Sequence, residues 1–250
     1  MPISDGFFLQ FLSDCDTIFL EKIHKSERFD RVLLKIKELF DLNHTIAAAY
    51  LEGFTYPWEA LEGIKELIVS LGNSLDPDCF DQVAHQVWVH KTAKVAPTAY
   101  LGAPCIVGEN TEVRHCAFVR GAALIGNGCV VGNSTELKNV ILFDSVQVPH
   151  YNYVGDSILG YKAHMGAGSV TSNVKSDKTL VVIHEQQEIP TGRKKVGAML
   201  GDGVEVGCNS VLNPGTVIGR NSNVYPTSCV RGVVPENAIY KNDGTVKMKR

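Results

Sequence analysis

The sequence predicts a mainly β fold, in which a parallel β-helix of hexapeptide repeats follows a small helical region. The strongest observation is a period of six residues: an apolar residue recurs without a slip at positions 89, 95, 101, 107, 113, 119, 125, 131, 137 and 143. Glycine directly follows four of these residues, at positions 102, 108, 126 and 132. The same period resumes from Leu200 to Val230 after an interruption. Repeats of six are typical of a coil in which each hexapeptide supplies one short strand and one turn.

Residues 1–84 form the predicted helical region. Apolar residues at positions 29, 32, 33, 36 and 40 have the spacing of one helix face. A second helix is expected to begin near Pro57, because proline suits the first turn, and to end at Gly72, which suits the C-terminal cap. Its buried face would consist of Trp58, Leu61, Ile64, Ile68 and Leu71. We expect these helices to cap the first coil and so protect an open strand edge.

Residues 85–240 form the predicted β-helix, with an insertion at about 174–197 and a C-terminal tail at 241–250. The apolar residue of each hexapeptide should point inward and stack on its equivalents in neighbouring coils. Because no single coil can bury that face alone, many coils are needed. The insertion is polar and contains Arg193, Lys194 and Lys195. This composition suits either a solvated loop or a loop that meets phosphate groups.

Composition excludes several classes of function. The chain has 250 residues, of which 44% are hydrophobic and 20% charged, as in ordinary globular proteins. A net charge of −3 leaves no basic surplus for a phosphate backbone, so no nucleic-acid partner is expected. No signal-like N-terminus and no apolar stretch long enough to span a membrane is present, so we expect a cytoplasmic protein without membrane contact. Small, buried, reduced side chains are expected for the cysteines at 15, 79, 105, 116, 129, 208 and 229.

The repeat region resembles the left-handed β-helix of hexapeptide-repeat acyltransferases, in which three hexapeptides form one coil. With that coil, residues 18 apart stack at about the interstrand spacing of 4.8 Å. Arg120 and Lys138 have this spacing, and each follows an inward aliphatic residue, so both side chains point outward on one face. Two stacked cations repel unless an anion lies beside them, which suggests a phosphate site. The alternative is that each cation pairs with a surface carboxylate such as Glu136 or Glu112.

His150 falls on the next outward position of the six-residue count. One coil below it is Gly132, whose missing side chain would leave room beside the imidazole. The count then slips, because Phe143 and Val154 are 11 residues apart rather than 12. Such breaks often occur next to active sites, where they change the direction of a side chain. His150 is therefore either a functional residue or a surface histidine.

Residues 119–173 more specifically resemble the acetyltransferase domain of bifunctional bacterial enzymes that combine glucosamine-1-phosphate acetyltransferase with N-acetylglucosamine-1-phosphate uridylyltransferase. Three stretches carry the resemblance: VRGAALIGNGCVVGNSTELKN, VPHYNYVGDSILG and HMGAGSVTSN. The stretch GDGVEVGCNSVLNPGTVIG extends it across the later coils. The whole chain is similar to short monofunctional, nucleotidyltransferase-like proteins. The glycine-rich segment that opens the uridylyltransferase half has no counterpart in MPISDGFFLQFLSDCDT.

The resemblance implies an acetyl-CoA-dependent acetyltransferase that acts on an aminosugar phosphate or a nucleotide-linked sugar, in the supply of cell-wall precursors. His150 would be the general base, and an imidazole suits that task at neutral pH. Arg120 and Lys138 would bind the sugar phosphate. The implied sugar contacts are Tyr153, His164 and Asn173.

The resemblance also implies where acetyl-CoA binds and how the chains assemble. Backbone N–H groups near Gly166, Ala167 and Gly168 would stabilise the oxyanion. The other implied cofactor contacts are Cys208, Tyr225 and Pro226. Acyltransferases of this type are homotrimers with sites between adjacent chains, so a homotrimer is expected.

Departures from the family pattern keep alternatives open. His164 stands in place of an asparagine, Val174 in place of a tyrosine and Cys208 in place of a serine. These changes motivate a non-catalytic alternative, namely a scaffold or a sugar-nucleotide-binding protein. A hexapeptide-repeat carbonic anhydrase would need three zinc-binding histidines. His85 and His90 have the required spacing but no third histidine nearby, so no metal site is predicted.

Overall fold

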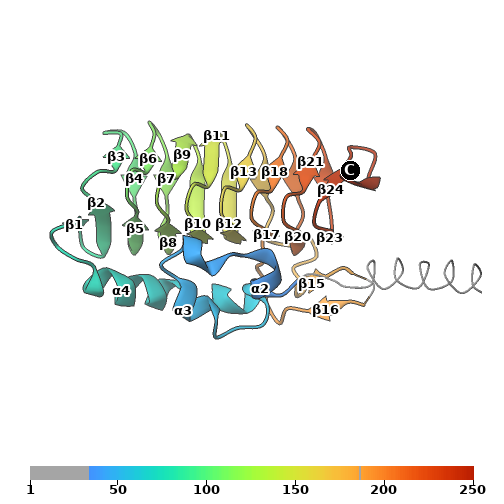
Figure 1. The fold of residues 1–250 in the computed structure, drawn as a ribbon, viewed down its shortest axis with the longest axis horizontal. Helices are drawn as coiled ribbons and strands as arrows, with labels where there is room; N and C mark the ends of the chain where they lie inside the picture. The colour runs from blue at the N-terminus through green and yellow to red at the C-terminus, as the bar shows by residue number, and fades with distance from the viewer. Residues whose placement is uncertain (1–33, 186) are drawn as a thin grey trace, which may run out of the picture. The chain divides into compact units, whose positions relative to one another are not determined.

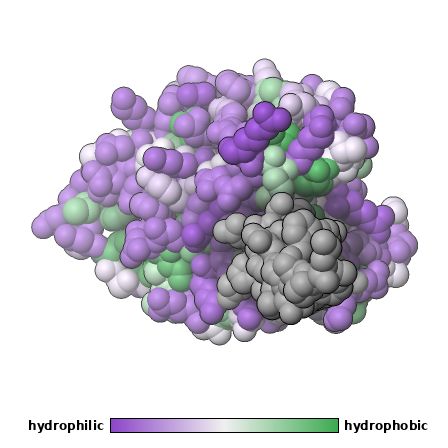
Figure 2. All heavy atoms as spheres, turned by 45° about the vertical axis from the view of Figure 1, so that its right-hand side comes forward, coloured by the Kyte–Doolittle hydropathy of each residue, from purple (hydrophilic) through white to green (hydrophobic). Residues whose placement is uncertain are grey.

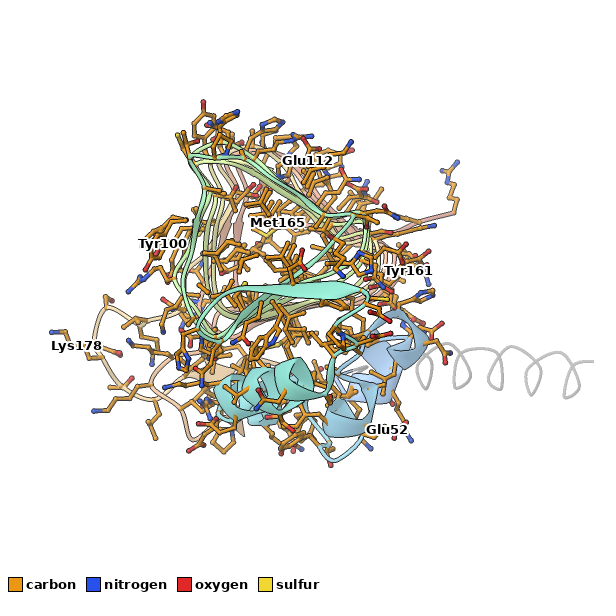
Figure 3. All side chains as sticks on the ribbon, turned by 90° about the vertical axis from the view of Figure 1, so that its left-hand side faces the viewer. Glu52, Tyr100, Glu112, Tyr161, Met165 and Lys178 are labelled. Atoms are coloured by element: carbon orange, nitrogen blue, oxygen red, sulfur yellow. The ribbon has the colours of Figure 1, made fainter. Side chains whose placement is uncertain are left out.

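Strands stack rung upon rung along one axis in the part of the chain that the computed structural model describes, residues 34–185 and 187–250 (Figure 1). The expected helix positions 29, 32 and 33 lie outside these residues. Viewed along the axis, the coil has three sides that meet at corners, with Met165 inside and Tyr100 outside (Figure 3). The predicted fold class, a left-handed parallel β-helix of hexapeptide repeats with a small helical region, is confirmed.

The three sides are named here by their surroundings. The polar face consists of β3 (Lys94–Val95), β6 (Glu112–Val113), β9 (Val130–Asn133), β11 (Gln147–His150), β13 (His164–Met165), β18 (Glu205–Val206), β21 (Asn223–Val224) and β24 (Ala238–Tyr240). The open face consists of β4 (Tyr100–Leu101), β7 (Phe118–Val119), the first residues of β10 (Glu136–Leu142) and β12 (Tyr153–Leu159), β14 (Val170–Thr171), β19 (Val211–Leu212) and β22 (Cys229–Val230). The covered face consists of β2 (Val87–His90), β5 (Cys105–Val107), β8 (Ala123–Ile125), the last residues of β10 and β12, β17 (Ala198–Leu200), β20 (Thr216–Ile218) and β23 (Val233–Val234).

The six-residue period fills the interior. Val113, Val119, Ile125, Val131 and Leu137 are each at most 1% exposed, because each points inward against its equivalents one rung away. Outside, the surface seen in Figure 2 is mainly hydrophilic, with small hydrophobic patches. Burial of the repeated aliphatic column therefore accounts for the coil.

The slip in the count lies earlier than predicted. Leu142, not Phe143, pairs with Ile125 in the ladder, so one residue is lost at the corner after Leu137. There β10 turns through the single left-handed residue Asn139, with φ of 54°. Phe143 still satisfies the period of six but occupies a corner position, where its ring packs 5.1 Å from that of Phe40. The slip is thus a shortened corner rather than a bulge near residue 150.

This register also corrects the surroundings of His150. The ladder pairs His150 with Asn133, and Gly132 lies against Pro149. A Cβ added to Gly132 would come within 1.5 Å of the Pro149 carbonyl oxygen. Gly132 therefore makes room for the backbone of the next rung and not for the imidazole.

Within residues 34–84, the helical region contains five short elements: α2 (Ile36–Leu39), η1 (Leu42–His44), α3 (Ala48–Leu51), η2 (Pro57–Leu61) and α4 (Ile64–Ser74). The single helix expected from Pro57 is therefore two elements. The expected cap at Gly72 is wrong, since Gly72 lies inside α4 and Leu75 is the C-cap. An added Cβ at Gly72 would lie 2.3 Å from the ring of Trp88, so the glycine lets this ring pack against α4.

The helices lie along one side of the coil instead of capping its first rung (Figure 1). α4 contacts β5, β8 and β10, and η2 contacts β12. Every residue of β5 and β8 is consequently buried. Every residue of β17 and β20 is buried as well, whereas β7 and β19 alternate between exposed and buried. The edge of the first rung is paired by β1 (Phe80–Ala84), which runs antiparallel to β2. At the other end, β25 (Val246–Met248) runs antiparallel to β24.

The insertion leaves the coil after β14 and returns at β17. It contains an antiparallel pair, β15 (Val182–Ile183) and β16 (Ile189–Pro190), and it buries Val181 and Val196 fully. Among the residues that the structure describes, no helix has the length and apolar character needed to cross a membrane.

Candidate functional site

A cluster around Asp156, called here the Asp156 cluster, lies at the corner between the open and covered faces. The Asp156 side chain is 6% exposed and lies 3.4 Å from Lys138 Nζ. Asn139 Nδ2 donates to Asp156 Oδ1 at 2.9 Å, and Asn173 Nδ2 donates to Oδ2. Three side chains from the two neighbouring rungs are thus oriented by one buried carboxylate.

The backbone explains why an aspartate occupies this corner. Asp156 has φ of 48° and sits one rung above Asn139, which has φ of 54°. Asn and Asp tolerate this left-handed conformation better than most other residues. The shortened corner therefore places two short polar side chains side by side, and they bond to each other.

Tyr153 and Arg120 complete the cluster on the side of the open face. The Tyr153 hydroxyl accepts a hydrogen bond from Asn173 Nδ2 at 3.2 Å. Burial, followed by the charge of Asp156, raises the pKa of the Tyr153 phenol, so it stays protonated at neutral pH. Arg120 donates to Glu136 at 2.8 Å, and this bond raises the pKa of its guanidinium.

The structure brings four of the proposed acceptor residues together, namely Arg120, Lys138, Tyr153 and Asn173. Of the two interpretations of the cations, pairing with carboxylates is present, although Glu112 pairs with Arg114 instead. Asp156 was missed by sequence reasoning. Its spacing of 18 from Lys138, which places a carboxylate one rung from a cation, was the signal that could have found it.

A second group, called here the His150 corner, lies where the polar and open faces meet. His150 is exposed at the end of β11. Its carbonyl oxygen accepts a hydrogen bond from Gly168 N at 3.0 Å. Asn152 Nδ2 donates to the carbonyl of Gly166 at 2.9 Å and so joins the same two rungs. The chain segment that carries His150 is therefore fixed to the G-A-G turn.

The proposed cofactor contacts continue along this corner. Asn209 N donates to the carbonyl of Ala167, and Thr227 N donates to the carbonyl of Cys208, both at 2.8 Å. Pro226 lies against Gly207 in the next rung. Tyr225, which precedes it, is 45% exposed. The residues proposed for acetyl-CoA thus form one column that begins beside His150.

His164 belongs to neither group. It lies on the polar face in β13, and its Nδ1 is 2.7 Å from Glu205 Oε2 in the neighbouring rung. The His164 side chain is 34% exposed. In the structure it is one half of a surface pair on the polar face.

Cys15 lies outside the described residues, and the other six cysteines differ in part from the expectation that they are buried. Cys105 and Cys129 are fully buried, and burial raises the pKa of each thiol to about 12. Four others are exposed and free, namely Cys79, Cys116, Cys208 and Cys229. Cys116, Cys208 and Cys229 fall on turns or outward positions of the coil, and Cys79 lies in the turn before β1, outside the repeat.

Within residues 34–185 and 187–250, no group of three or more His, Cys, Asp or Glu side chains lies close enough together to hold a metal ion. His90 Nδ1 instead lies 2.9 Å from the hydroxyl of Thr92.

These features define a hexapeptide-repeat β-helix protein with a polar cluster at one edge of its open face and a histidine at the other. The chain is similar to the bifunctional sugar-1-phosphate nucleotidylyltransferase/acetyltransferase of Sulfurisphaera tokodaii, with 26% identity over 89% of this chain and 58% of that protein. It is also similar to the bifunctional protein GlmU of Methanocaldococcus jannaschii, with 26% identity over 92% of this chain and 58% of that protein. The resemblance inferred from the motifs is confirmed.

A shorter region is more similar still. The bifunctional protein GlmU of Caldanaerobacter subterraneus is 38% identical over 53% of this chain and 26% of that protein. Among solved structures, the polySia specific acetyltransferase NeuO gives a TM-score of 0.40 at 13% identity, over 63% of this chain and 82% of that one. No family model matches the chain. The chain spans 58% of the length of the first two relatives.

Proposed function

We propose that this chain transfers an acetyl group from acetyl-CoA to the amine of an aminosugar phosphate or a nucleotide-linked aminosugar. The observation that carries the proposal is the arrangement of the open face, whose two edges hold the Asp156 cluster and the His150 corner. Similarity to acetyltransferase-containing relatives over most of the chain supports the reaction class.

The exposed imidazole of His150 is the proposed general base. The amine nitrogen of the acceptor attacks the thioester carbon of acetyl-CoA, and His150 takes the proton that the nitrogen loses. When the tetrahedral intermediate collapses, the C–S bond breaks and the imidazolium returns the proton to the CoA thiolate. The products are an amide and CoA thiol.

One backbone group in the G-A-G turn suits the oxyanion. Gly166 N already donates to the carbonyl of Val206 at 2.7 Å, and Gly168 N donates to that of His150 at 3.0 Å. The remaining N–H of the turn is that of Ala167. We therefore assign the Ala167 N–H as the donor to the oxygen on which negative charge develops.

The proposed acceptor site uses the cations of the Asp156 cluster. Arg120 and Lys138 are 45% and 29% exposed, so their charged ends remain within reach of a phosphate. Arg120 bonds Glu136 through one nitrogen, which leaves further N–H donors for the ligand. Asp156 holds Lys138 and Asn173 in place, while the protonated Tyr153 hydroxyl is available to the sugar.

A complete site needs a second copy of the chain. The open face carries exposed apolar side chains, with Tyr100 at 60%, Phe118 at 43% and Val211 at 38% exposure. Tyr100 and Phe118 lie on neighbouring rungs, and exposed apolar patches often mark interfaces. We propose a homotrimer in which the His150 corner of one copy faces the Asp156 cluster of the next.

The test is release of CoA thiol from acetyl-CoA with a panel of hexosamine phosphates and nucleotide-linked aminosugars. His150→Ala should lower turnover at least about 100-fold, which is the usual contribution of a general base. His115→Ala is a matched control, since this exposed histidine lies two rungs away on the same corner. Background rates for wild type and His150→Ala across the whole panel would reject catalysis and favour the non-catalytic, sugar-nucleotide-binding alternative.

A further inference from the structure

A cavity of about 360 Å³ lies between the insertion and the later rungs of the coil, outside both groups described above. Its walls come from two sources. Ser172, Asn213 and Arg231 are supplied by three successive rungs at the corner between the open and covered faces, and Lys175, Asp177 and His184 are supplied by the insertion. The volume lies within the range of pockets that hold small molecules.

The insertion is fixed against the coil, so the cavity is already formed. Val181 and Ile183 are fully buried beneath it. A Cβ added to Gly215 would lie 2.8 Å from Val181 Cγ1, and one added to Gly232 would lie 2.6 Å from the carbonyl oxygen of His184. Both glycines also have left-handed φ angles, of 80° and 81°. Glycine at these two positions permits the close approach that positions His184.

His184 orients the guanidinium of Arg231. Arg231 Nη2 lies 3.0 Å from His184 Nε2, and His184 Nδ1 lies 3.2 Å from Glu188 Oε1. A guanidinium has no acceptor, so Nε2 must accept and the imidazole proton must sit on Nδ1, where it donates to Glu188. The bond to His184 uses one of five N–H donors of Arg231. In residues 34–185 and 187–250, no carboxylate lies within ion-pair distance of the Arg231 guanidinium. Its other N–H donors are therefore not held by an ion pair.

The charges of the lining favour an anion. Lys175 and Arg231 are cationic, and Asp177 is the one carboxylate of the lining, with its oxygen 3.4 Å from Lys175 Nζ. His184 is neutral while it accepts from Arg231. Ser172 adds a hydroxyl one rung from Asn213, at about 4.8 Å spacing. A phosphate group matches this set, because it accepts hydrogen bonds from guanidinium, ammonium and hydroxyl donors.

We propose that this cavity binds the phosphate of a nucleotide, with Arg231 as its principal ligand and Lys175 and Ser172 as supporting donors. Two phosphate esters share this chemistry: the adenosine 3′,5′-bisphosphate portion of CoA and the nucleoside diphosphate portion of a nucleotide-linked sugar. Binding is a property of the resting protein, so it stands or falls separately from the acetyl transfer proposed above.

Isothermal titration calorimetry tests the proposal by measuring the affinity of the full chain for adenosine 3′,5′-bisphosphate, uridine diphosphate and inorganic phosphate. Wild type should bind one of the two nucleotides at one site per chain, and the nucleotide that binds identifies the source. Arg231→Gln should weaken that binding at least about tenfold, because it removes a charge-assisted bond. Arg114→Gln, on the polar face and paired with Glu112, is the matched control and should bind as wild type does.

Melting curves establish that the variants fold. If Arg231→Gln is unfolded, Lys175→Gln replaces it in the titration. Its affinity for the nucleotide should be several-fold lower than that of wild type, because the substitution removes a supporting cation. Failure of wild type to bind either nucleotide overturns the proposal. So does binding by the folded variants that equals that of wild type and of Arg114→Gln.

Discussion

Replacing Asp156 by asparagine should destabilise the protein through the corner that this residue organises. Asparagine preserves the volume and tolerates the φ of 48°, so the change removes the charge without adding backbone strain. It leaves Lys138 without its carboxylate partner. It also points an NH₂ group at side chains that are themselves donors, Asn139 and Asn173 among them.

The expected loss follows from these contacts. A hydrogen bond that involves a charged group contributes about 1.5–3 kcal/mol, and a neutral one about 1 kcal/mol. Lys138 is 29% exposed, so its share must be discounted for solvent screening. One amide bond and a reduced charged contact together give about 2 kcal/mol in the free energy of unfolding.

Urea unfolding followed by circular dichroism at neutral pH and fixed protein concentration measures this difference. Asp177→Asn is the matched control, because Asp177 also lies 3.4 Å from a lysine but is 56% exposed. It should change stability by less than about 0.5 kcal/mol. Equal effects of the two substitutions would refute the view that Asp156 organises its corner.

Three further predictions concern other parts of the molecule. Gly72→Ala should cost about 1–2 kcal/mol despite the better helix propensity of alanine, because the new methyl group meets the ring of Trp88; an increase in melting temperature would contradict this. The thiols of Cys105 and Cys129, whose pKa is raised to about 12, stay protonated and should remain unlabelled by iodoacetamide at pH 8; early labelling of either, detected by peptide mass spectrometry, would contradict their burial. Labelling at that pH should instead occur at Cys79, Cys116, Cys208 and Cys229. Phe118→Glu should convert the proposed trimer to monomers by light scattering and abolish turnover; a monomeric wild type would exclude the shared site.

The sequence predicts the coil well because burial of one residue in six is a strong and regular requirement. It conceals the shortened corner, since Phe143 is apolar and keeps the period even though Leu142 takes the inward place. The packing of Phe143 on Phe40 depends on a contact between distant segments, which periodicity cannot show. Register at a corner therefore needs the structure.

A second sequence pattern, apart from the period of six, could have predicted that one face of the coil is covered. Every third hexapeptide carries a continuous run of apolar residues, such as CIV at 105–107, ALI at 123–125 and AML at 198–200. Such runs are typical of strands that are buried on both faces. They indicate a side that something else covers, although only the structure shows that α4 and η2 cover it at β5, β8, β10 and β12.

Part of the candidate site could also be predicted from the sequence. The spacing of 18 between Arg120 and Lys138 gives a shared outward edge, and the motif resemblance adds Tyr153 and Asn173. The role of Asp156 was hidden because a carboxylate in a polar stretch resembles a solvated residue. The pairing of His164 with Glu205 could not be predicted, because the two residues are 41 positions apart across the insertion.

The antiparallel strands at the two ends of the coil limit how long the solenoid can grow. A further molecule would have to extend β1 or β25, yet β1 contains a register irregularity between Gln82 and Ala84, and all three residues of β25 are exposed. Short or irregular edge strands resist the addition of another chain. End-to-end fibre formation is thereby discouraged, and a designer who wished to lengthen this coil would first have to remove both terminal hairpins.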